Sequence, residues 1–324
     1  MKKIINLYKP VGMTPLQAIN KFREINKNYA GKKMSYAGRL DPMAEGVLLI
    51  LVGEETKKIG QYLGFDKEYR TEILIGLSTD TGDVLGIPKK GKLLTNNSAI
   101  EEEETTNQSS ENLSFKGHGL ENNNEKELIR KLKKIIKELK GKYEQKIPNY
   151  SSYKIKGKPM FYYARKGEII EEIKKGVYIK SIKINSIYKL SGRKLLKYVV
   201  NKIDKVNGDF RQEEIKEKWM SLLDNQDIGT INKLIINNNK DNKIHSQKSL
   251  QNRKDIFLVI DVTINCSSGT YIRAIADDIG KQFGGGLLLS LKRTMVGKFQ
   301  IEDSMKVWRY SYVRFLLLFF DNHY

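Results

Sequence analysis

Residues 46–53 read GVLLILVG, six consecutive apolar side chains bounded by two glycines. A continuous apolar run of this length is typical of a strand buried inside a core. The preceding segment 14–26, TPLQAINKFREIN, has the features of a helix start, because Thr14 is a capping residue, Pro15 fits the first helical position and Gln17 completes a capping box. Its apolar residues recur on one face, which predicts a helix packed on that core.

Four further segments extend the pattern. Residues 67–79, KEYRTEILIGLST, alternate polar and apolar side chains and predict a half-buried strand. Residues 126–141, KELIRKLKKIIKELKG, predict an amphipathic helix with a basic outer face. Residues 256–284 predict a strand, a Ser-Gly turn and a helix from about Tyr271, and residues 287–301 a last strand. Strands at hairpin-like spacing between helices predict an α+β fold with a mixed sheet.

Two polar segments without periodicity interrupt these elements, at about residues 89–124 and 205–254. Their composition, rich in Asn, Lys, Glu and Ser, predicts surface insertions or disordered loops. The remaining chain, residues 1–305, is expected to form one domain, followed by a short C-terminal tail at 306–324. The apolar run FLLLFF in that tail is far shorter than the roughly 20 residues of a membrane span. No signal peptide is recognised, so we expect a cytoplasmic protein with no membrane partner.

The charge and the few cysteines and histidines narrow the possible functions. Lys and Arg total 58 against 38 Asp and Glu, a formal net charge of +20. Such a surplus favours a polyanionic partner, first of all nucleic acid, although a genome biased toward Lys, Asn and Ile codons would produce a similar surplus. Cys266 is the single cysteine, and the three histidines form no ligand pattern. We therefore expect no intramolecular disulfide, no CxxC metal site and no histidine-based metal or triad chemistry.

Three stretches contain residues able to carry chemistry, each with a structural alternative. Asp41 in GRLDPM is either a functional carboxylate or the N-cap of a helix that continues through Pro42. Arg273 lies at a strand-to-helix junction, where it clamps an anion or is an exposed helix-start arginine. Residues 147–168 interleave tyrosines with lysines, which suits stacking of RNA bases and binding of phosphates, or else an ordinary half-buried strand and helix.

The order of short motifs along the chain is more specific than any one of them. Taken together they resemble the TruB-type tRNA pseudouridine synthases, over about residues 4–200 and 256–305. The motifs are KPVGMT (9–14), AGRLDPMAEGVLLILVGEETK (37–57), DKEYR (66–70), STDTGD (78–83), IPNYSSYKIKGK (147–158), YYARKG (162–167), SSGTYIRAIADDIG (267–280) and LSLKR (289–293).

The resemblance implies a pseudouridine synthase fold, with a mixed, largely antiparallel central sheet flanked by helices and loops. It implies an isomerase that converts the T-loop uridine of tRNA, position 55, to pseudouridine without a cofactor. The partner would be the T-arm stem-loop of tRNA, and no obligatory protein partner is expected, so the protein would be a monomer. Many bacterial members carry a PUA-like RNA-binding domain at the C-terminus, for which the tail 306–324 is too short. The alternative is a non-catalytic RNA-binding protein or tRNA-folding chaperone with the same fold.

The resemblance also implies roles for individual residues. Asp41 holds the place of the catalytic aspartate, which acts at the ribose C1′ while the base detaches. Arg273 is expected to pair with Asp41 and keep it ionised. Tyr69 matches a tyrosine that stacks on the target base and is implicated in proton transfer.

Seven more positions are expected to contact the substrate. The family usually has a histidine where this chain has Tyr36, so only a stacking or space-filling role carries over. Arg39 replaces a small neutral residue and is either an additional phosphate contact or a solvated surface arginine. The expected substrate-binding residues are Tyr36, Arg39, Lys57, Tyr153, Lys154, Tyr271 and Leu291.

Overall fold

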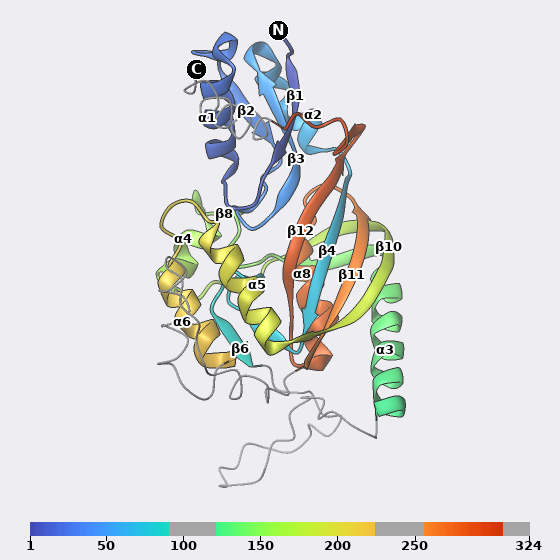
Figure 1. Cartoon of the computed structure of the whole chain (residues 1–324). Coiled ribbons are helices and arrows are strands. Elements are labelled where there is room, and N and C mark those ends of the chain that lie inside the picture. Colours follow the sequence, from blue (N-terminus) through green and yellow to red (C-terminus); the bar gives the residue numbers. More distant parts are fainter. Residues whose placement is uncertain (91–120, 224–255, 307–324) are drawn as a thin grey trace, which may run out of the picture.

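The computed structural model describes residues 1–90, 121–223 and 256–306 (Figure 1). The strands are β1 (Ile4–Lys9), β2 (Met34–Ala37), β3 (Glu45–Val52), β4 (Lys67–Ile75), β5 (Leu77–Thr79), β6 (Pro88–Lys90), β7 (Gly141–Lys146), β8 (Lys154–Ile155), β9 (Lys158–Pro159), β10 (Lys174–Ser191), β11 (Ile256–Cys266), β12 (Gly286–Val296) and β13 (Phe299–Gln300). The helices are α1 (Pro15–Ile25), α2 (Ile59–Leu63), α3 (Glu121–Glu138), α4 (Met160–Arg165), α5 (Gly192–Asp204), α6 (Gln212–Leu223) and α8 (Ile272–Gly280), with short 3-10 turns η1 (Lys27–Tyr29), η2 (Gly53–Lys58) and η3 (Lys281–Phe283).

A nine-stranded sheet organises the described chain (Figure 1). Its order is β1-β3-β12-β4-β11-β10-β7, with β2 paired to β3 and β13 paired to β12. All of its pairings are antiparallel except the one between β12 and β3. The predicted α+β class with a mixed, largely antiparallel sheet is therefore confirmed.

The parallel pairing joins an N-terminal unit of β1, β2, β3 and α1 to the rest of the sheet. It is short, with Lys292 opposite Glu45 and Arg293 opposite Gly46. A Cβ atom on Gly46 would lie 2.2 Å from the carbonyl oxygen of Arg293, and the glycine has φ +110°. Only glycine accepts both the conformation and the close approach, so this residue allows the two parts of the sheet to meet.

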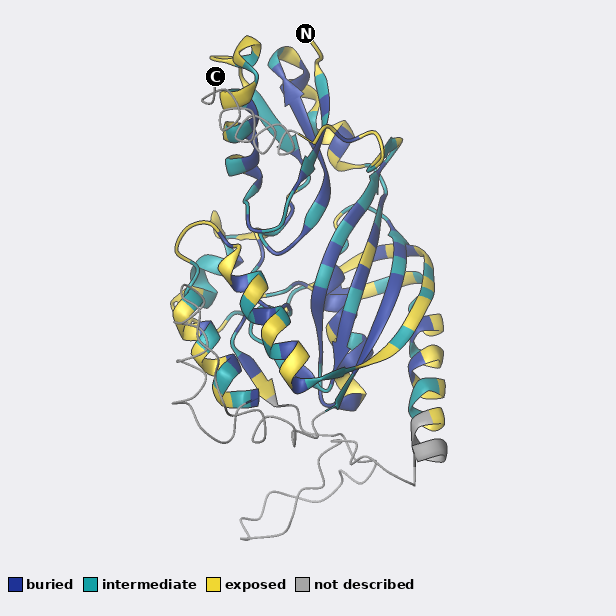
Figure 2. Ribbon diagram, viewed as in Figure 1, coloured by how far each residue is buried: buried dark blue, intermediate teal, exposed yellow. Residues whose placement is uncertain are grey.

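Three hydrophobic clusters fill the described fold (Figure 2), and one of them joins β2 and β3 to Val296 of β12, across the junction of the two parts. The largest one lies between the β12-β4-β11 strands and α8, and a smaller one lies between α1, β1 and β3. The predicted helix at the start of the chain is confirmed as α1, with Thr14 and Gln17 forming both halves of the capping box. The run 46–53 is confirmed as the core of β3, in which Gly46–Val52 are all buried.

The interpretation of residues 205–254 as an insertion without regular structure was wrong for its first part. Helix α6 occupies Gln212–Leu223, and its Ile215, Trp219 and Leu223 are buried at helical spacing. The indole nitrogen of Trp219 donates a hydrogen bond to the Gly86 carbonyl at 3.1 Å. The apolar stripe was readable in the sequence, but the surrounding Lys- and Asn-rich composition obscured it. Residues 224–254, 91–120 and the FLLLFF run lie outside the described residues.

None of the helices in the described ranges has the length and apolarity needed to cross a bilayer.

The N-terminal unit buries a lysine. Lys9 ends β1 with a side chain that is 0% exposed, and its ammonium donates hydrogen bonds to the carbonyl oxygens of Pro10 at 2.9 Å and Met13 at 2.7 Å. Burial lowers the pKa of Lys9 from 10.5 to about 7, and the negative charge of Asp41 opposes this shift. Lys9 thus closes the loop after β1 at the cost of desolvating an ammonium group.

A Lys9→Met variant should therefore change how stability depends on pH. Above about pH 7 the unfolded chain binds a proton at Lys9 that the folded protein does not hold, so the free energy of unfolding rises with pH up to about 10.5. The variant should lack this rise, whatever its absolute stability. Urea unfolding of both proteins at pH values on either side of 7 measures the difference, and equal slopes would contradict the burial of a titrating ammonium.

Candidate active site

Asp41 lies in the turn between β2 and β3. The backbone N–H of Ala44 donates to the Asp41 carbonyl at 3.0 Å, and β3 begins at the next residue. The interpretation of Asp41 and Pro42 as a helix start was therefore wrong: the chain goes directly from the turn into a strand. The Pro42 carbonyl accepts a hydrogen bond from Gly12 at 2.8 Å, which fixes the turn against the loop after β1.

The expected pair of Asp41 and Arg273 is confirmed. Their Oδ2 and Nη2 atoms lie 3.1 Å apart, and the side chain of Arg273 is 7% exposed while that of Asp41 is 32% exposed. Arg273 belongs to the first turn of α8, but it points into the protein, so the reading as an exposed helix-start arginine was wrong. A buried guanidinium beside a half-open carboxylate leaves one carboxylate edge available to a ligand.

Two more loops complete the surroundings of Arg273. Its Nη1 donates to the Thr81 carbonyl at 2.7 Å and its Nη2 to the Tyr150 carbonyl at 3.1 Å. Gly82 packs against the same side chain, since a Cβ atom there would lie 3.3 Å from the Cβ of Arg273. The STDTGD and IPNYSSY motifs, far apart in sequence, therefore meet at the arginine that holds Asp41.

Asp83 is a buried acid in the same region that the sequence reasoning did not select. It is 4% exposed and accepts hydrogen bonds from the Thr81 hydroxyl and the Leu85 backbone, both at 2.9 Å. Burial raises the pKa of Asp83 to about 6, although the positive charge of Arg273 opposes the shift. Asp83 is the last residue of the STDTGD motif, and this was the signal in the sequence that could have selected it as a site residue.

Tyr69 and Arg293 face each other across neighbouring strands β4 and β12. Tyr69 is 9% exposed, and burial raises the pKa of its hydroxyl, while the positive charge of Arg293 acts in the opposite direction. The negative charge of Asp41 also acts on this hydroxyl, which places the three groups in one electrostatic neighbourhood. Tyr69 is therefore protonated at neutral pH.

Arg293 is the second residue that the sequence reasoning passed over, although the LSLKR motif contains it. It is 1% exposed, and its guanidinium donates to the carbonyl oxygens of Val47 at 2.8 Å, Gly38 at 3.1 Å and Arg39 at 3.3 Å. One planar side chain thus ties β3 and the start of the Asp41 turn to β12.

Three of the expected substrate-binding residues lie around this centre. Leu291 is 8% exposed and belongs to the same hydrophobic cluster as Leu40 and Tyr69. Tyr271 is the N-cap residue of α8, and burial raises the pKa of its hydroxyl. Tyr153 is 40% exposed and lies three residues after Tyr150, whose carbonyl accepts a hydrogen bond from Arg273.

In the described ranges, the side chains of the other four form no hydrogen bond or ion pair with Asp41, Arg273 or Arg293. The ring of Tyr36 packs against the smaller hydrophobic cluster beneath α1, and in the described ranges no hydrogen bond or ion pair joins it to Asp41. Lys57 is 69% exposed on η2 and pairs with Glu54 at 2.5 Å, so its ammonium is directed to the surface rather than to a pocket. Lys154 is exposed on β8. Arg39 is exposed, with its guanidinium carbon 6.0 Å from the centre of the Phe161 ring.

The chain is similar in sequence to one protein family and to several bacterial proteins. The family model described as "TruB family pseudouridylate synthase (N terminal domain)" matches residues 26–117 and 102–202, together more than half of the chain. The tRNA pseudouridine synthase B of Caldanaerobacter subterraneus is 30% identical over 302 residues, which cover 93% of this chain and 71% of that protein. The enzyme of the same name from Clostridium tetani is 28% identical over 310 residues, 95% of this chain and 72% of the relative.

The corresponding protein of Pelotomaculum thermopropionicum is 29% identical, and the match covers 94% of this chain and 66% of the relative. Among solved structures, a chain of a Cbf5-Nop10-Gar1 complex superposes with a TM-score of 0.46 at 16% identity, over 94% of this chain and 52% of that one. The present chain thus spans about two thirds of its bacterial relatives' length and half of that solved chain. By the family match and the identity to its relatives, the chain belongs to the TruB family of pseudouridylate synthases.

Proposed function

We propose that this protein isomerises the T-loop uridine of tRNA, position 55, to pseudouridine, with Asp41 as the catalytic carboxylate. The observation that carries the proposal is the ion pair of Asp41 with the buried Arg273, at 3.1 Å, in a chain of the TruB family. The relatives named above, each a tRNA pseudouridine synthase B, support tRNA as the substrate.

The reaction rearranges bonds within one nucleotide. The bond from N1 of uracil to C1′ breaks, the base turns, a bond from C5 to C1′ forms, and the proton on C5 is transferred in net terms to N1. Asp41 attacks or electrostatically stabilises C1′ while the base is detached. Arg273 orients the carboxylate for this step, because it is itself held by the Thr81 and Tyr150 carbonyls.

Tyr69 is proposed to stack on the detached base and to relay its proton. With its pKa raised by burial, the hydroxyl carries its proton at neutral pH and can donate it to N1 of the detached base. The phenolate left behind faces Arg293, whose positive charge favours the anion, and it can then accept the proton from C5, which restores the neutral tyrosine. Leu291, on the same face of β12 as Arg293, would bound the base on one side.

Contact with RNA is proposed for the surface formed by α4 and the β8–β9 hairpin. Cations lie over two rings there: Arg165 is 5.5 Å from the centre of the Phe161 ring, and Lys158 and Lys166 are 4.4 and 4.8 Å from that of Tyr162. Such pairs present aromatic faces and charges together, which suits unstacked bases and phosphates. These contacts would help offset the few kcal/mol needed to flip the target base out of the T-loop.

The proposal treats residues 1–305 as one catalytic domain that acts as a monomer in the cytoplasm, without a cofactor. The competing function is a non-catalytic RNA-binding protein or tRNA-folding chaperone of the same fold. The joint presence of Asp41, Arg273 and Tyr69 favours catalysis, because binding alone has no chemical need for a paired carboxylate beside a buried tyrosine.

Asp41→Asn should lower turnover by roughly a thousandfold or more, because the amide keeps the shape of the side chain but cannot act at C1′. Binding of tRNA should remain close to that of the wild type. Tritium release from C5-labelled tRNA measures turnover, and filter binding measures affinity.

Asp303→Asn, at an exposed carboxylate after β13, is the matched control and should keep the wild-type rate. Wild-type turnover in Asp41→Asn would contradict the assigned mechanism. A wild-type protein that binds tRNA but forms no pseudouridine in any tRNA, mapped by mass spectrometry, would establish the binding function instead.

Tyr36→His should be tolerated, with turnover within about one order of magnitude of the wild type. The reason is that the Tyr36 ring packs against the smaller hydrophobic cluster, a site where an imidazole also fills space. Tyr36→Ala should lower the melting temperature more than Tyr36→His, since it leaves a void. A collapse of turnover in Tyr36→His at unchanged melting temperature would show that the phenol has a role of its own.

A further inference from the structure

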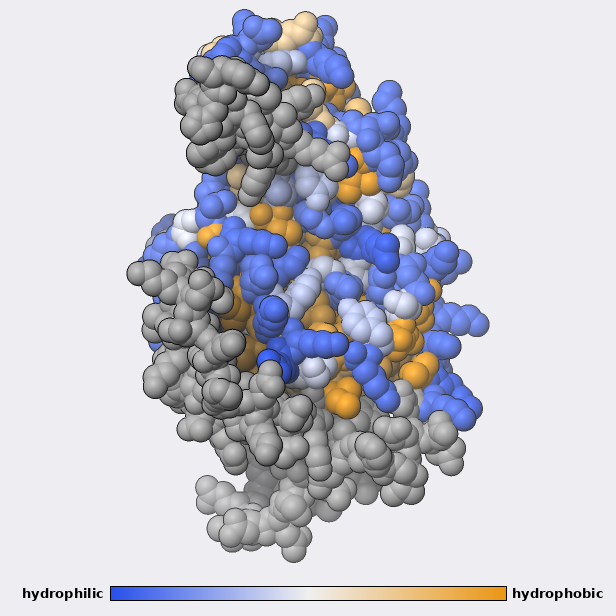
Figure 3. Space-filling view, viewed as in Figure 1, coloured by the Kyte–Doolittle hydropathy of each residue, from blue (hydrophilic) through white to orange (hydrophobic). Residues whose placement is uncertain are grey.

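Helix α5 has one face on the core and a basic face outside it. Leu195, Val199 and Ile203 are buried at successive turns. Another face of the helix is exposed (Figure 2). It carries, at helical spacing, the exposed lysines Lys194 and Lys197 and, directly after the helix, Lys205. Hydrophilic side chains gather over this part of the surface in the space-filling view (Figure 3).

The lysines of this face lack acidic partners among the described residues. No carboxylate of residues 1–90, 121–223 or 256–306 forms an ion pair with Lys194, Lys197, Lys202 or Lys205, whereas Lys216 on neighbouring α6 pairs with both Asp204 and Glu213. A hollow runs along the helix, and its described lining is Lys194, Lys197, Tyr198, Asn201, Lys202 and Lys205.

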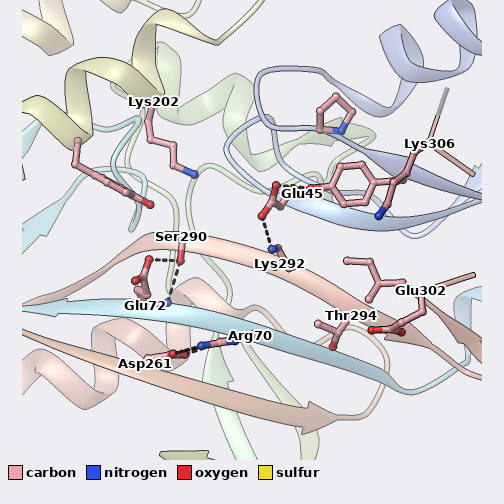
Figure 4. Close-up of a pocket in the computed structure, with 14 residues that line it drawn as sticks. Glu45, Arg70, Glu72, Lys202, Asp261, Ser290, Lys292, Thr294, Glu302 and Lys306 are labelled. Carbon is pink, nitrogen blue, oxygen red and sulfur yellow. Dashed lines mark hydrogen bonds and ion pairs between the residues drawn. The ribbon is translucent and has the colours of Figure 1, made fainter. Parts of the chain in front are cut away.

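The adjoining cavity, of about 880 Å³, differs in its charges (Figure 4). Lys202 points into it from α5, and Lys292 lies 3.0 Å from Glu45 while Arg70 lies 2.7 Å from Asp261. Counted over the whole lining, the four basic residues Arg70, Lys202, Lys292 and Lys306 are balanced by the four acidic residues Glu45, Glu72, Asp261 and Glu302. Burial lowers the pKa of Lys202, and the negative charges of Glu45 and Glu72 in the same cavity oppose this shift. The uncompensated charge therefore belongs to the outer face of α5 and not to the cavity.

The C-terminal end of α5 is fixed to the turn that carries Asp41. The Asn207 backbone N–H donates to the Gly12 carbonyl at 2.9 Å, and the Gly12 N–H donates to the Pro42 carbonyl at 2.8 Å. A Cβ atom on Gly12, which has φ +96°, would lie 1.8 Å from the carbonyl oxygen of Lys205. Two backbone hydrogen bonds, both made by Gly12, therefore connect the end of the basic face to Pro42, the residue after Asp41. From there the basic face extends along the helix.

We propose that the exposed lysines of α5 bind phosphates of the RNA whose target base reaches Asp41, as a second contact surface on the same substrate. The inference rests on the proposed function for the identity of that RNA. Lys194 and Lys205 are eleven residues apart, so the face is about 16 Å long, which spans several phosphates of one strand. An RNA strand is favoured over an acidic protein because the face is continuous with the candidate active site and offers charge without an apolar anchor.

The test is the triple variant Lys194→Gln, Lys197→Gln, Lys205→Gln in the full chain. These side chains are exposed, and circular dichroism checks that the fold is kept. Because each lysine that contacts a phosphate releases about one counterion, the slope of log Kd against log salt should fall by about two to three, with affinity for a tRNA transcript about a hundredfold or more weaker near 0.1 M salt.

The matched control is Lys133→Gln, Lys137→Gln, Lys140→Gln, on or just after α3, which lies on the other side of the molecule (Figure 1). It removes the same charge and should change affinity and slope much less. Equal effects of the two triple variants, or an unchanged slope in the α5 variant, would overturn the α5 surface. Both readouts measure RNA binding. The proposed function would fail in a different measurement, as an absence of pseudouridine, so the two failures are distinguishable.

Discussion

The buried charge of Arg273 is the constraint on which the candidate site depends. A guanidinium that is 7% exposed has lost most of its hydration, and it must recover that loss from acceptors inside the protein. Asp41 supplies the charge, and the Thr81 and Tyr150 carbonyls supply the remaining acceptors. Three segments that are distant in sequence are held in place by one side chain, and the Asp41 carboxylate is oriented as a consequence.

Arg293 is a second buried arginine, and it holds the start of the Asp41 turn against β12. It carries no carboxylate pair in the described ranges, and its charge is met by the Val47, Gly38 and Arg39 carbonyls and by the tyrosine across the strand pair. The junction of β3 with β12 at Gly46 is what brings these groups within reach. The pairing of strands β3 and β12 therefore also determines which charged groups lie together in the site.

Much of the fold could be predicted from local pattern. The glycine-bounded run of β3, the capping box of α1 and the alternation in β4 each depend on neighbouring residues, so they are readable along the chain. Helix α6 was missed because its apolar stripe lies in a polar, low-complexity stretch and is stabilised by Trp219 packing against a distant segment. Of the two alternatives for Asp41, the helix start was wrong, because whether an Asp-Pro pair starts a helix or a turn depends on the strand that follows.

The sequence by itself determined the motifs, and the family resemblance that these motifs carry implied the pairing of Asp41 with Arg273, which the structure then showed. Only the tertiary structure decided which other side chains share that environment. It buried Arg293 and Asp83 beside the pair and directed Lys57 to the surface. It also packed Tyr36 into the hydrophobic cluster under α1. The physical reason is that burial and side-chain direction are set by contacts between strands and loops far apart in the chain, which no local pattern records.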